Sequence, residues 1–303
     1  MLAEEDPGKR DPAGMTSRDQ LAAISRRVRT MSADQYNCFL DDLERALARE
    51  GICRREPNQL TPEQAEVVRQ LFDRDIFAIM TPMVVSAGQQ FPLLVKQRLT
   101  ACVELAGLSG QSDPTFAIIP LGQMVDRVVP LPAEGQYHYI LLEDALRMHV
   151  AQFFPGLRVV DCTFFRVTRN ADMRVQEDSA SDLLSGMQQV LAARKQSACV
   201  RLELAEGAGE TMRDFLQSAL NVRDDDLYIV RGPLDLAAFM QLSNLQGYDH
   251  LRYEPWPPRP SPLVMPGQSI FDTIADHDVV LIQPYESYQP VVRLVEEAAE
   301  DPD

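Results

Sequence analysis

The sequence predicts an α+β fold, and three observations lead to this class. Apolar runs typical of strands and amphipathic stripes typical of helices are interleaved irregularly between about residues 60 and 245, whereas a doubly wound sheet requires strict alternation. The stretch before this region carries only helical periodicity. Six prolines between Tyr253 and Pro266 separate it from a short C-terminal segment. We therefore expect a helical N-terminal segment, a mixed α+β domain and the opening of a further domain.

The N-terminal region is expected to be a disordered tail followed by helices. Residues 1–17 are polar and contain prolines and a glycine, a composition that buries no apolar core. From Leu21 onward, apolar side chains recur three and four positions apart. Ser32 and Gln35 match a capping box, so this stretch is either two helices or one long kinked helix ending near Gly51. The two apolar stripes comprise Leu21, Ile24, Val28 and Met31, then Tyr36, Leu40, Leu43 and Leu47.

The middle region begins near Ile52 and carries a strong helix signal. Thr61, Pro62 and Gln64 supply an N-cap, a proline in the first turn and a capping glutamine. Beyond this helix, strand-like and helix-like stretches follow one another. We expect strands at 76–80, 99–105, 116–119, 137–142, 199–204 and 227–230, and helices at 142–154, 180–194, 211–220 and 234–245.

A proline-rich connection precedes the C-terminal segment. Proline fixes its own φ and keeps its predecessor out of the helical region, so residues 253–266 predict an extended domain boundary. A short helix is expected at 270–275, and a longer one after Pro290. Between them, residues 279–282 form a solid apolar run, typical of a strand buried on both faces. Such a strand needs neighbours that the remainder up to Asp303 does not supply, so we expect an incomplete domain.

Composition limits the compartment and the partners. Of 303 residues, 45% are hydrophobic and 24% charged, and no apolar stretch is long enough for a membrane span or a signal peptide. The five cysteines are scattered without a CxxC pair, as in proteins of reducing compartments. A formal charge of -16 argues against nucleic-acid binding, which needs a basic surface. We expect a cytoplasmic protein with no transmembrane segment and no nucleic-acid partner.

Two segments resemble binding sites but favour other interpretations. Residues 206–210 (Glu-Gly-Ala-Gly-Glu) lie between a strand and a helix, yet they lack the lysine and third glycine of phosphate loops and carry flanking glutamates, which favours a turn. Residues 276–278 (Asp-His-Asp) precede the apolar run, where adjacent side chains point opposite ways, so a solvated turn is favoured over a metal site.

One basic cluster is the candidate for phosphate contact. It consists of Arg166, Arg169 and Arg174. In a strand, the first two point to opposite faces, so all three reach one phosphate only if the chain bends. Two interpretations stay open: phosphate contact, or ion pairs with nearby acids such as Asp172 and Glu177.

Four strings of the sequence carry a family resemblance. They are Met80-Thr81-Pro82-Met83-Val84-Val85 with Phe91-Pro92-Leu93; Phe165-Arg166-Val167-Thr168-Arg169-Asn170-Ala171-Asp172; Gly232-Pro233-Leu234-Asp235-Leu236; and Ile270-Phe271-Asp272 with Asp278-Val279-Val280-Leu281 and Pro284-Tyr285-Glu286-Ser287-Tyr288. In this order they resemble the polyphosphate kinase family, bacterial enzymes that reversibly transfer the terminal phosphate of ATP to inorganic polyphosphate. The similarity extends from about Leu21 to the last residue.

The resemblance implies a domain organisation. Members of this family have a helical N-terminal domain, a head domain and two catalytic domains of phospholipase-D-like α/β fold. By this similarity, residues 1–17 are a disordered tail and 18–51 a partial N-terminal domain. Residues 52–267 are the head domain, and 268–303 are the truncated start of the first catalytic domain.

The resemblance further implies that the chain is part of a polyphosphate kinase. Family members use ATP, Mg²⁺ and a phosphohistidine intermediate. The histidine and the residues that bind ATP and magnesium match no position here, so we expect no catalytic residue, no metal site, no bound cofactor and no activity of this chain alone. The substrate-proximal candidates are Pro284, Tyr285, Glu286 and Ser287.

Partners also follow from the resemblance. The family's head domain is implicated in dimerisation, so we expect a homo-oligomer through this domain, or association with a full-length polyphosphate kinase. The kinase complex would be cytoplasmic or peripheral to the inner membrane. An alternative function is a stand-alone dimerisation or regulatory scaffold related to the head domain. A polyphosphate-binding module is a third, which the charge of -16 disfavours.

Overall fold

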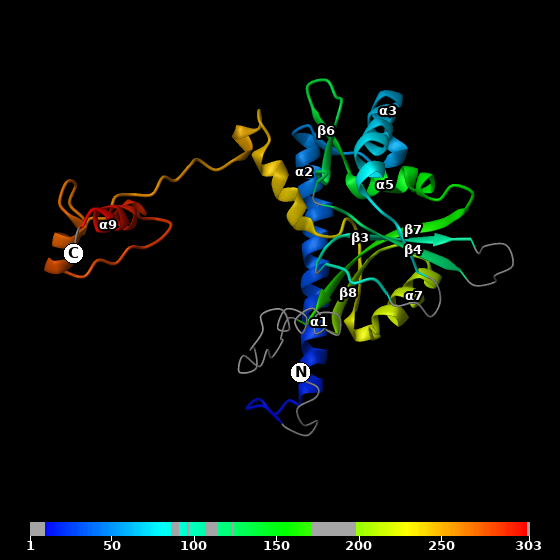
Figure 1. Cartoon of the computed structure of the whole chain (residues 1–303), viewed down its shortest axis with the longest axis horizontal. Coiled ribbons are helices and arrows are strands. Elements are labelled where there is room, and N and C mark those ends of the chain that lie inside the picture. The colour runs from blue at the N-terminus through cyan, green and yellow to red at the C-terminus, as the bar shows by residue number, and fades with distance from the viewer. Residues whose placement is uncertain are drawn as a thin grey trace. The chain divides into compact units, whose positions relative to one another are not determined.

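The described part of the chain has the α+β fold that the sequence predicts. The computed structural model describes residues 10–85, 91–95, 97–106, 114–122, 124–170 and 198–301 (Figure 1). The chain divides into two compact units, Met1–Gln241 and Leu242–Asp303.

One long helix opens the first unit. Helix α1 (Ser17–Asn37) continues through a π-helical stretch (Cys38–Leu43) into α2 (Glu44–Arg49). It begins at a capping box in which the Thr16 hydroxyl accepts a hydrogen bond from the Asp19 amide. Of the two alternatives that the sequence leaves open, two helices or one long helix, the structure has one continuous helical stretch. The capping box expected at Ser32 and Gln35 is wrong, because helical hydrogen bonding continues through both residues.

Little of this helix is buried. Tyr36 and Phe39 pack into the unit, whereas Ile24 and Met31 are 51% and 54% exposed. Ahead of the helix, residues 10–16 form a turn closed by a bridge between Arg10 and Thr16, and residues 1–9 of the expected tail lie outside the described residues.

A six-stranded sheet forms the body of the first unit. Neighbouring strands run antiparallel except for the parallel pair at the end of the sheet. The strand order is β2 (Met83–Val85), β4 (Thr115–Pro120), β3 (Thr100–Leu105), β7 (Val159–Arg169), β8 (Cys199–Ala205) and β9 (Leu227–Val230).

Both faces of this sheet are covered. Successive side chains of β3 point to opposite faces of the sheet, so Val103 lies in one core and Cys102 in the other. The first core is closed by α3 (Pro62–Leu71) and α5 (Leu142–His149), and the second by α7 (Glu210–Leu220) (Figure 1). Since both faces are buried, the strands are nearly continuous apolar runs, which is why most of them could be predicted.

A smaller sheet extends the first core. Its strand order is β1 (Ile52–Arg54), β6 (Tyr137–Leu141) and β5 (Val128–Leu131), with β1 parallel and β5 antiparallel to β6. The hairpin of β5 and β6 leads directly into α5, and so it places the start of α5 beside the residue that precedes β5.

Most predicted elements are confirmed where the structure describes them. The strands near 99–105, 116–119, 137–142, 199–204 and 227–230 are present, as are the helices near 142–154 and 211–220. The helix predicted at 234–245 is a 3-10 helix, Leu236–Asn244. The helix predicted at 180–194 lies outside the described residues.

The strand predicted at 76–80 is wrong. This stretch continues α3 as a π-helical segment, Phe72–Ile76, and a short α4 (Phe77–Ile79). Ile76 is fully buried, while Phe77 and Ile79 are 47% and 41% exposed. A one-sided helical face therefore produces an apolar run that resembles a buried strand.

The second unit contains two helices, α8 (Ile270–Asp276) and α9 (Gln289–Glu300), at the expected positions. The Glu297 carboxylate accepts hydrogen bonds from the Ser269 hydroxyl (2.7 Å) and the Ile270 amide (2.8 Å), and so it caps the start of α8. The buried strand predicted at 279–282 is wrong: Val280 and Ile282 are 67% and 60% exposed, and no described strand pairs with this run.

Candidate functional site

A buried ion pair lies at the centre of the first unit. Arg127, just before β5, donates from Nε to Glu143 Oε2 at 2.9 Å, and Glu143 lies in the first turn of α5. The β5–β6 hairpin brings the two together, because the Leu142 amide donates to the Arg127 carbonyl at 2.8 Å. Their side chains are 11% and 7% exposed, so solvent screens this pair only weakly.

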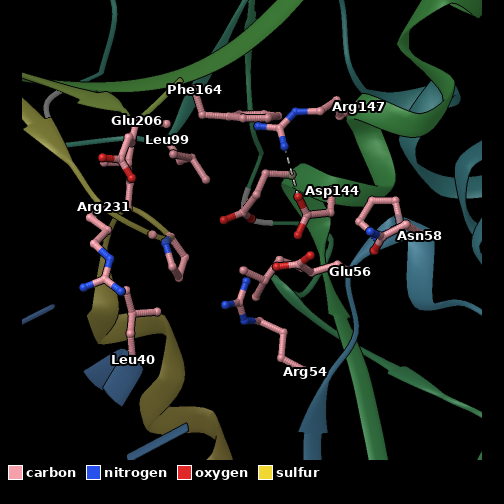
Figure 2. Close-up of a pocket in the computed structure, with 17 residues that line it drawn as sticks. Leu40, Arg54, Glu56, Asn58, Leu99, Asp144, Arg147, Phe164, Glu206 and Arg231 are labelled. Carbon is pink, nitrogen blue, oxygen red and sulfur yellow. Dashed lines mark hydrogen bonds and ion pairs between the residues drawn. The ribbon is translucent and has the colours of Figure 1, made fainter. Parts of the chain in front are cut away.

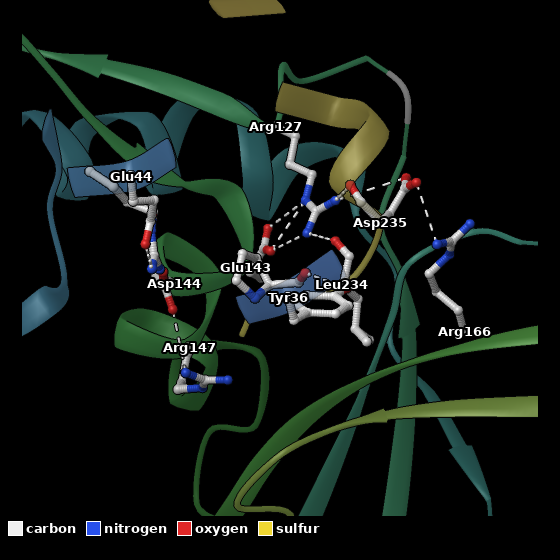
Figure 3. A network of polar contacts seen from close by, with 11 residues as sticks. Tyr36, Glu44, Arg127, Glu143, Asp144, Arg147, Arg166, Leu234 and Asp235 are labelled. Atoms are coloured by element: carbon white, nitrogen blue, oxygen red, sulfur yellow. Dashed lines mark hydrogen bonds and ion pairs between the residues drawn. The ribbon is translucent and has the colours of Figure 1, made fainter. Parts of the chain in front are cut away.

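The same arginine holds the segment that follows β9. Its Nη1 donates to the Asp235 carbonyl at 2.9 Å, and its Nη2 donates to the Leu234 carbonyl. Asp235 has φ of 58°, in the left-handed region that few residues other than glycine adopt. Arg127 thus secures the backbone of Asp235, whose carboxylate lies between Arg127 and Arg166 (Figure 3).

Helix α1 is attached to this segment. The Tyr36 hydroxyl donates to the Pro233 carbonyl at 2.9 Å, and burial raises the pKa of Tyr36 to about 12. Gly232 has φ of 112°, and a Cβ there would lie 3.2 Å from Leu40 Cδ1. Only glycine therefore combines this backbone conformation with the close approach of the helix.

Arg166 is an ion-paired residue of β7. Its Nε donates to the Gln97 carbonyl at 3.0 Å, and its Nη1 lies 3.4 Å from Asp235 Oδ1 and 3.6 Å from Glu203 Oε2. The strand pairing of β7 with β8 places Glu203 directly opposite Arg166. Of the two open interpretations, ion pairing is present for Arg166, with two acids that are distant in sequence. Phosphate contact stays a prediction.

Arg169, the other described arginine of the basic cluster, lies apart from these contacts. Arg169 lies at the end of β7, beyond a register shift after Thr168, and lines neither of the cavities that Arg166 lines. Arg174 and the acids Asp172 and Glu177 lie outside the described residues. Phosphate contact by Arg169 also stays a prediction.

Two cavities meet at Arg166 and Asp235. The first, of about 590 Å³, lies between α1 and the sheet, and Arg201 and Glu203 also line it. The second, of about 620 Å³, we call the arginine cavity. Its polar lining consists of Gln97, Arg98, Asp126, Arg127, Arg166, Asp235 and Gln241.

A third cavity, of about 560 Å³, has a mixed polar lining (Figure 2). Burial, and then the neighbouring Glu143, raise the pKa of Asp144 to about 6, against the opposing effect of Arg147 at 3.3 Å. Burial prevails because Arg147 is 45% exposed and its charge is screened. The Arg147 guanidinium also lies over the Phe164 ring, 5.1 Å from its centroid. The lining carries charges of both signs: the acids are Glu56, Glu143, Asp144 and Glu206, and the arginines are Arg54, Arg147 and Arg231.

The two segments that resemble binding loops make local contacts within the fold. Residues 206–209 form the turn that was predicted here, Glu210 begins α7, and the Gly209 amide faces Asp161 Oδ2 at 3.4 Å. The His277 ring contacts the Leu263 carbonyl at 3.1 Å. Among the residues that the structure describes, no three His, Cys, Asp or Glu side chains cluster as metal ligands would.

The C-terminal loop has a defined backbone within the second unit. The Glu286 carboxylate accepts a hydrogen bond from the Ile282 amide at 3.0 Å. The backbone amide of Arg259, in the proline-rich segment, donates to the Tyr285 carbonyl at 2.9 Å. The Ser287 amide returns a bond to the Arg259 carbonyl at 2.7 Å. Substrate proximity of Pro284, Tyr285, Glu286 and Ser287 stays a prediction.

Several residues in and beside the arginine cavity were not identified from the sequence. Arg98, Arg127 and Glu143 are separated in the sequence, and nothing in it indicates that they lie near one another. One usable signal is Asp235, which lies within the string that starts at Gly232 and follows a strand. Another is Glu143, which directly follows an apolar run at a helix start.

Comparison with known proteins gives the site its family context. The family model described as "Polyphosphate kinase middle domain" matches residues 63–242, more than half of the chain. This chain belongs to the polyphosphate kinase family. The model "Polyphosphate kinase C-terminal domain 1" matches residues 269–303. The family resemblance inferred from the sequence is thus confirmed.

Individual members of the polyphosphate kinase family match almost the whole chain. The enzyme named polyphosphate kinase from Rhodopirellula baltica is 34% identical over 364 residues, covering 98% of this chain and 43% of the relative. That from Bacillus cereus is 36% identical over 297 residues, covering 96% and 42%. The chain therefore spans less than half the length of these relatives.

A solved structure shares the fold. The crystal structure of polyphosphate kinase from Porphyromonas gingivalis matches with a TM-score of 0.71 at 23% identity, over 94% of this chain and 41% of that one. In the chain described here, none of the described helices is both long enough and apolar enough to span a membrane.

Proposed function

We propose that this chain is the middle-domain part of a polyphosphate kinase that transfers the terminal phosphate of ATP to inorganic polyphosphate. The observation that carries this proposal is the pair of consecutive matches, to the middle domain at 63–242 and to C-terminal domain 1 at 269–303. In the parent reaction, Mg²⁺ would neutralise the phosphates and a histidine would carry the transferred phosphoryl group. We assign neither the magnesium ligands nor the phosphorylated histidine to residues of this chain.

The role we propose for the chain itself is assembly rather than chemistry. It would supply the head-domain surface through which kinase chains dimerise, with residues 52–267 as that domain and 268–303 as the start of the first catalytic domain. The environments of two of the four histidines support this role. His138 contacts Arg55 and Gln64, and the His149 ring packs against Phe72 with its Nε2 buried, which disfavours phosphoryl transfer to either ring.

A reducing compartment fits this proposal. All five cysteines are free thiols, and burial raises the pKa of Cys102 and Cys162, which keeps both protonated and unreactive. We place the kinase in the cytoplasm, either free or in a complex at the inner membrane.

An activity assay tests the proposal directly. The purified chain is incubated with ATP, Mg²⁺ and polyphosphate, with the full-length Bacillus cereus enzyme as the positive control. We expect no sustained ADP formation by the chain alone. ADP formation in proportion to the amount of chain would contradict the inactive role.

A second measurement tests assembly. Sedimentation of the chain alone, and mixed with the full-length relative, should give a homodimer and a mixed species. A chain that stays monomeric at micromolar concentration in both samples would refute the assembly role. A homodimer that never associates with the kinase would support the stand-alone scaffold instead.

A further inference from the structure

The arginine cavity contains charged donors that the fold does not use. Arg98 lines it, and no described residue forms an ion pair or hydrogen bond with its guanidinium. In a chain with 45 acidic and 29 basic residues, an arginine without a carboxylate partner beside a cavity is available for an external anion. Arg127 differs, because its donors are already directed at Glu143, Leu234 and Asp235.

Arg166 supplies a second, partly available guanidinium. Its Nε is fixed by the Gln97 carbonyl, which orients the group, and its Nη2 donates no hydrogen bond within the described residues. The side chain is 15% exposed, so an anion that reaches it is largely shielded from water. Weak screening strengthens attraction to a charged ligand there.

The Asp235 carboxylate, which faces Arg166 and Arg127, is held loosely. Asp235 Oδ1 lies 3.4 Å from Arg166 Nη1, and Oδ2 lies 3.8 Å from Arg127 Nη1. Strong pairs between a guanidinium and a carboxylate are about 2.7–2.9 Å long. The side chain is 34% exposed, while the Asp235 carbonyl is fixed by Arg127 at 2.9 Å. The carboxylate can therefore rotate away without movement of the backbone.

We propose that the arginine cavity binds a phosphate-chain anion between Arg98 and Arg166, and that the Asp235 carboxylate occupies the position of a phosphate until the ligand displaces it. Planar guanidinium groups match the oxygens of phosphates, and a chain of phosphates presents more charge than one carboxylate. The choice of a phosphate chain rests on the proposed function, whereas the choice of an anion rests on the cavity itself.

Calorimetric titration of the whole chain with tripolyphosphate tests this site. Arg98→Gln and Arg166→Gln should each weaken binding about fivefold or more, because each removes a charged donor. Asp235→Asn should strengthen binding several-fold, because it removes the competing charge while keeping the shape. The matched control is Arg213→Gln on α7. The Arg213 side chain is 45% exposed and lies outside the cavity, so this variant should bind as the wild type does.

The Asp235 variant should bind tripolyphosphate more tightly and the arginine variants less tightly, and this opposition makes the outcome decisive. Absence of tripolyphosphate binding at low salt, or weaker binding by Asp235→Asn, would overturn the proposal. Since Arg166 contacts the fold, Arg98→Gln serves as the second variant, and unchanged binding by Arg98→Gln would also overturn it. Circular dichroism of each variant confirms that it is folded.

Two ligands, tripolyphosphate and ATP, distinguish the source of the phosphates. If tripolyphosphate and ATP bind with similar affinity, the cavity recognises any phosphate chain. If only tripolyphosphate binds, the cavity is selective for the polymer. Both outcomes support the proposal. Binding of ATP alone would overturn it. The two proposals fail separately. ADP formation by the chain would contradict the inactive role, whereas unchanged tripolyphosphate binding by Arg98→Gln in an inactive chain would overturn only the cavity.

Discussion

The Tyr36 hydroxyl donates a 2.9 Å hydrogen bond to the carbonyl of Pro233, which lies 197 residues further along the chain. Through this bond, the helix that opens the chain is joined to the segment that carries Asp235. The bond is buried, so the carbonyl has no water to replace its partner. Helix α1 and the arginine cavity therefore depend on the same short segment.

Replacement of Tyr36 by Phe should destabilise the first unit. The change leaves the Pro233 carbonyl buried without a donor, which costs about 1–3 kcal/mol of the free energy of unfolding. Urea denaturation measures this cost. Tyr253→Phe is the matched control, since its side chain is 101% exposed and should show no change. Equal stability of both variants would show that the hydrogen bond contributes nothing.

The pair of Arg127 and Glu143 should behave as a buried ion pair. Arg127→Met leaves the Glu143 carboxylate, 7% exposed, without its cation, at a cost of about 3–5 kcal/mol. The double variant Arg127→Met/Glu143→Leu should recover much of this loss, because no unpaired charge remains. Arg69→Met is the control, since Arg69 is 49% exposed in its pair with Glu66 and should have no measurable effect. A double variant as unstable as the single one would contradict the interpretation.

Asp144 should make the stability of the first unit depend on pH. Burial raises its pKa from 3.8 to about 6. Because the pKa is higher in the folded chain, this carboxyl contributes stability that is fully present below pH 3.8 and is lost as the pH rises through about 6. The asparagine of Asp144→Asn does not ionise. This variant should therefore lose less stability than the wild type between pH 4.5 and 7.5, by roughly 1–3 kcal/mol.

Urea denaturation at both pH values tests this expectation. Asp34→Asn on the exposed surface of α1 is the control and should follow the wild type. Parallel pH profiles of wild type and Asp144→Asn would show that Asp144 does not titrate in this range.

The fold could be predicted where burial alone determines structure. Strands β3 and β4 lie between two cores, and their apolar runs report this directly. The same signal failed at residues 76–80, where a helix buries Ile76 and exposes Ile79. It failed again at 279–282, because an apolar run becomes a strand only when neighbouring strands offer hydrogen bonds.

The candidate site could be predicted only in part. Arg166 was identified because it lies among other arginines, but its partners Glu203 and Asp235 are brought to it by strand pairing and by the segment after β9. Nothing in the sequence distinguishes Arg98. What makes it a candidate is that its guanidinium has no partner within the described residues, and this depends on the tertiary structure.

The second unit offers a prediction that is independent of the first. The Ser269 hydroxyl and the Ile270 amide donate to Glu297, and these bonds lower the pKa of this carboxyl below 4.5. A lowered pKa in the folded chain means that the contribution to stability is present above pH 4.5 and is lost as the pH falls through the lower value. The amide proton shift of Ile270 should therefore titrate in the acid range.

Glu297→Gln should abolish this titration, because the amide side chain keeps its shape but carries no ionisable group. Glu296→Gln, at the adjacent exposed position of α9, is the control and should titrate as the wild type does. Nuclear magnetic resonance follows both variants from pH 6 to pH 2. An Ile270 amide that moves equally in wild type and Glu297→Gln would mean that another group caps α8. Its movement in the wild type and in Glu296→Gln alone would assign the cap to Glu297, because only that carboxylate accepts from the first amide of the helix.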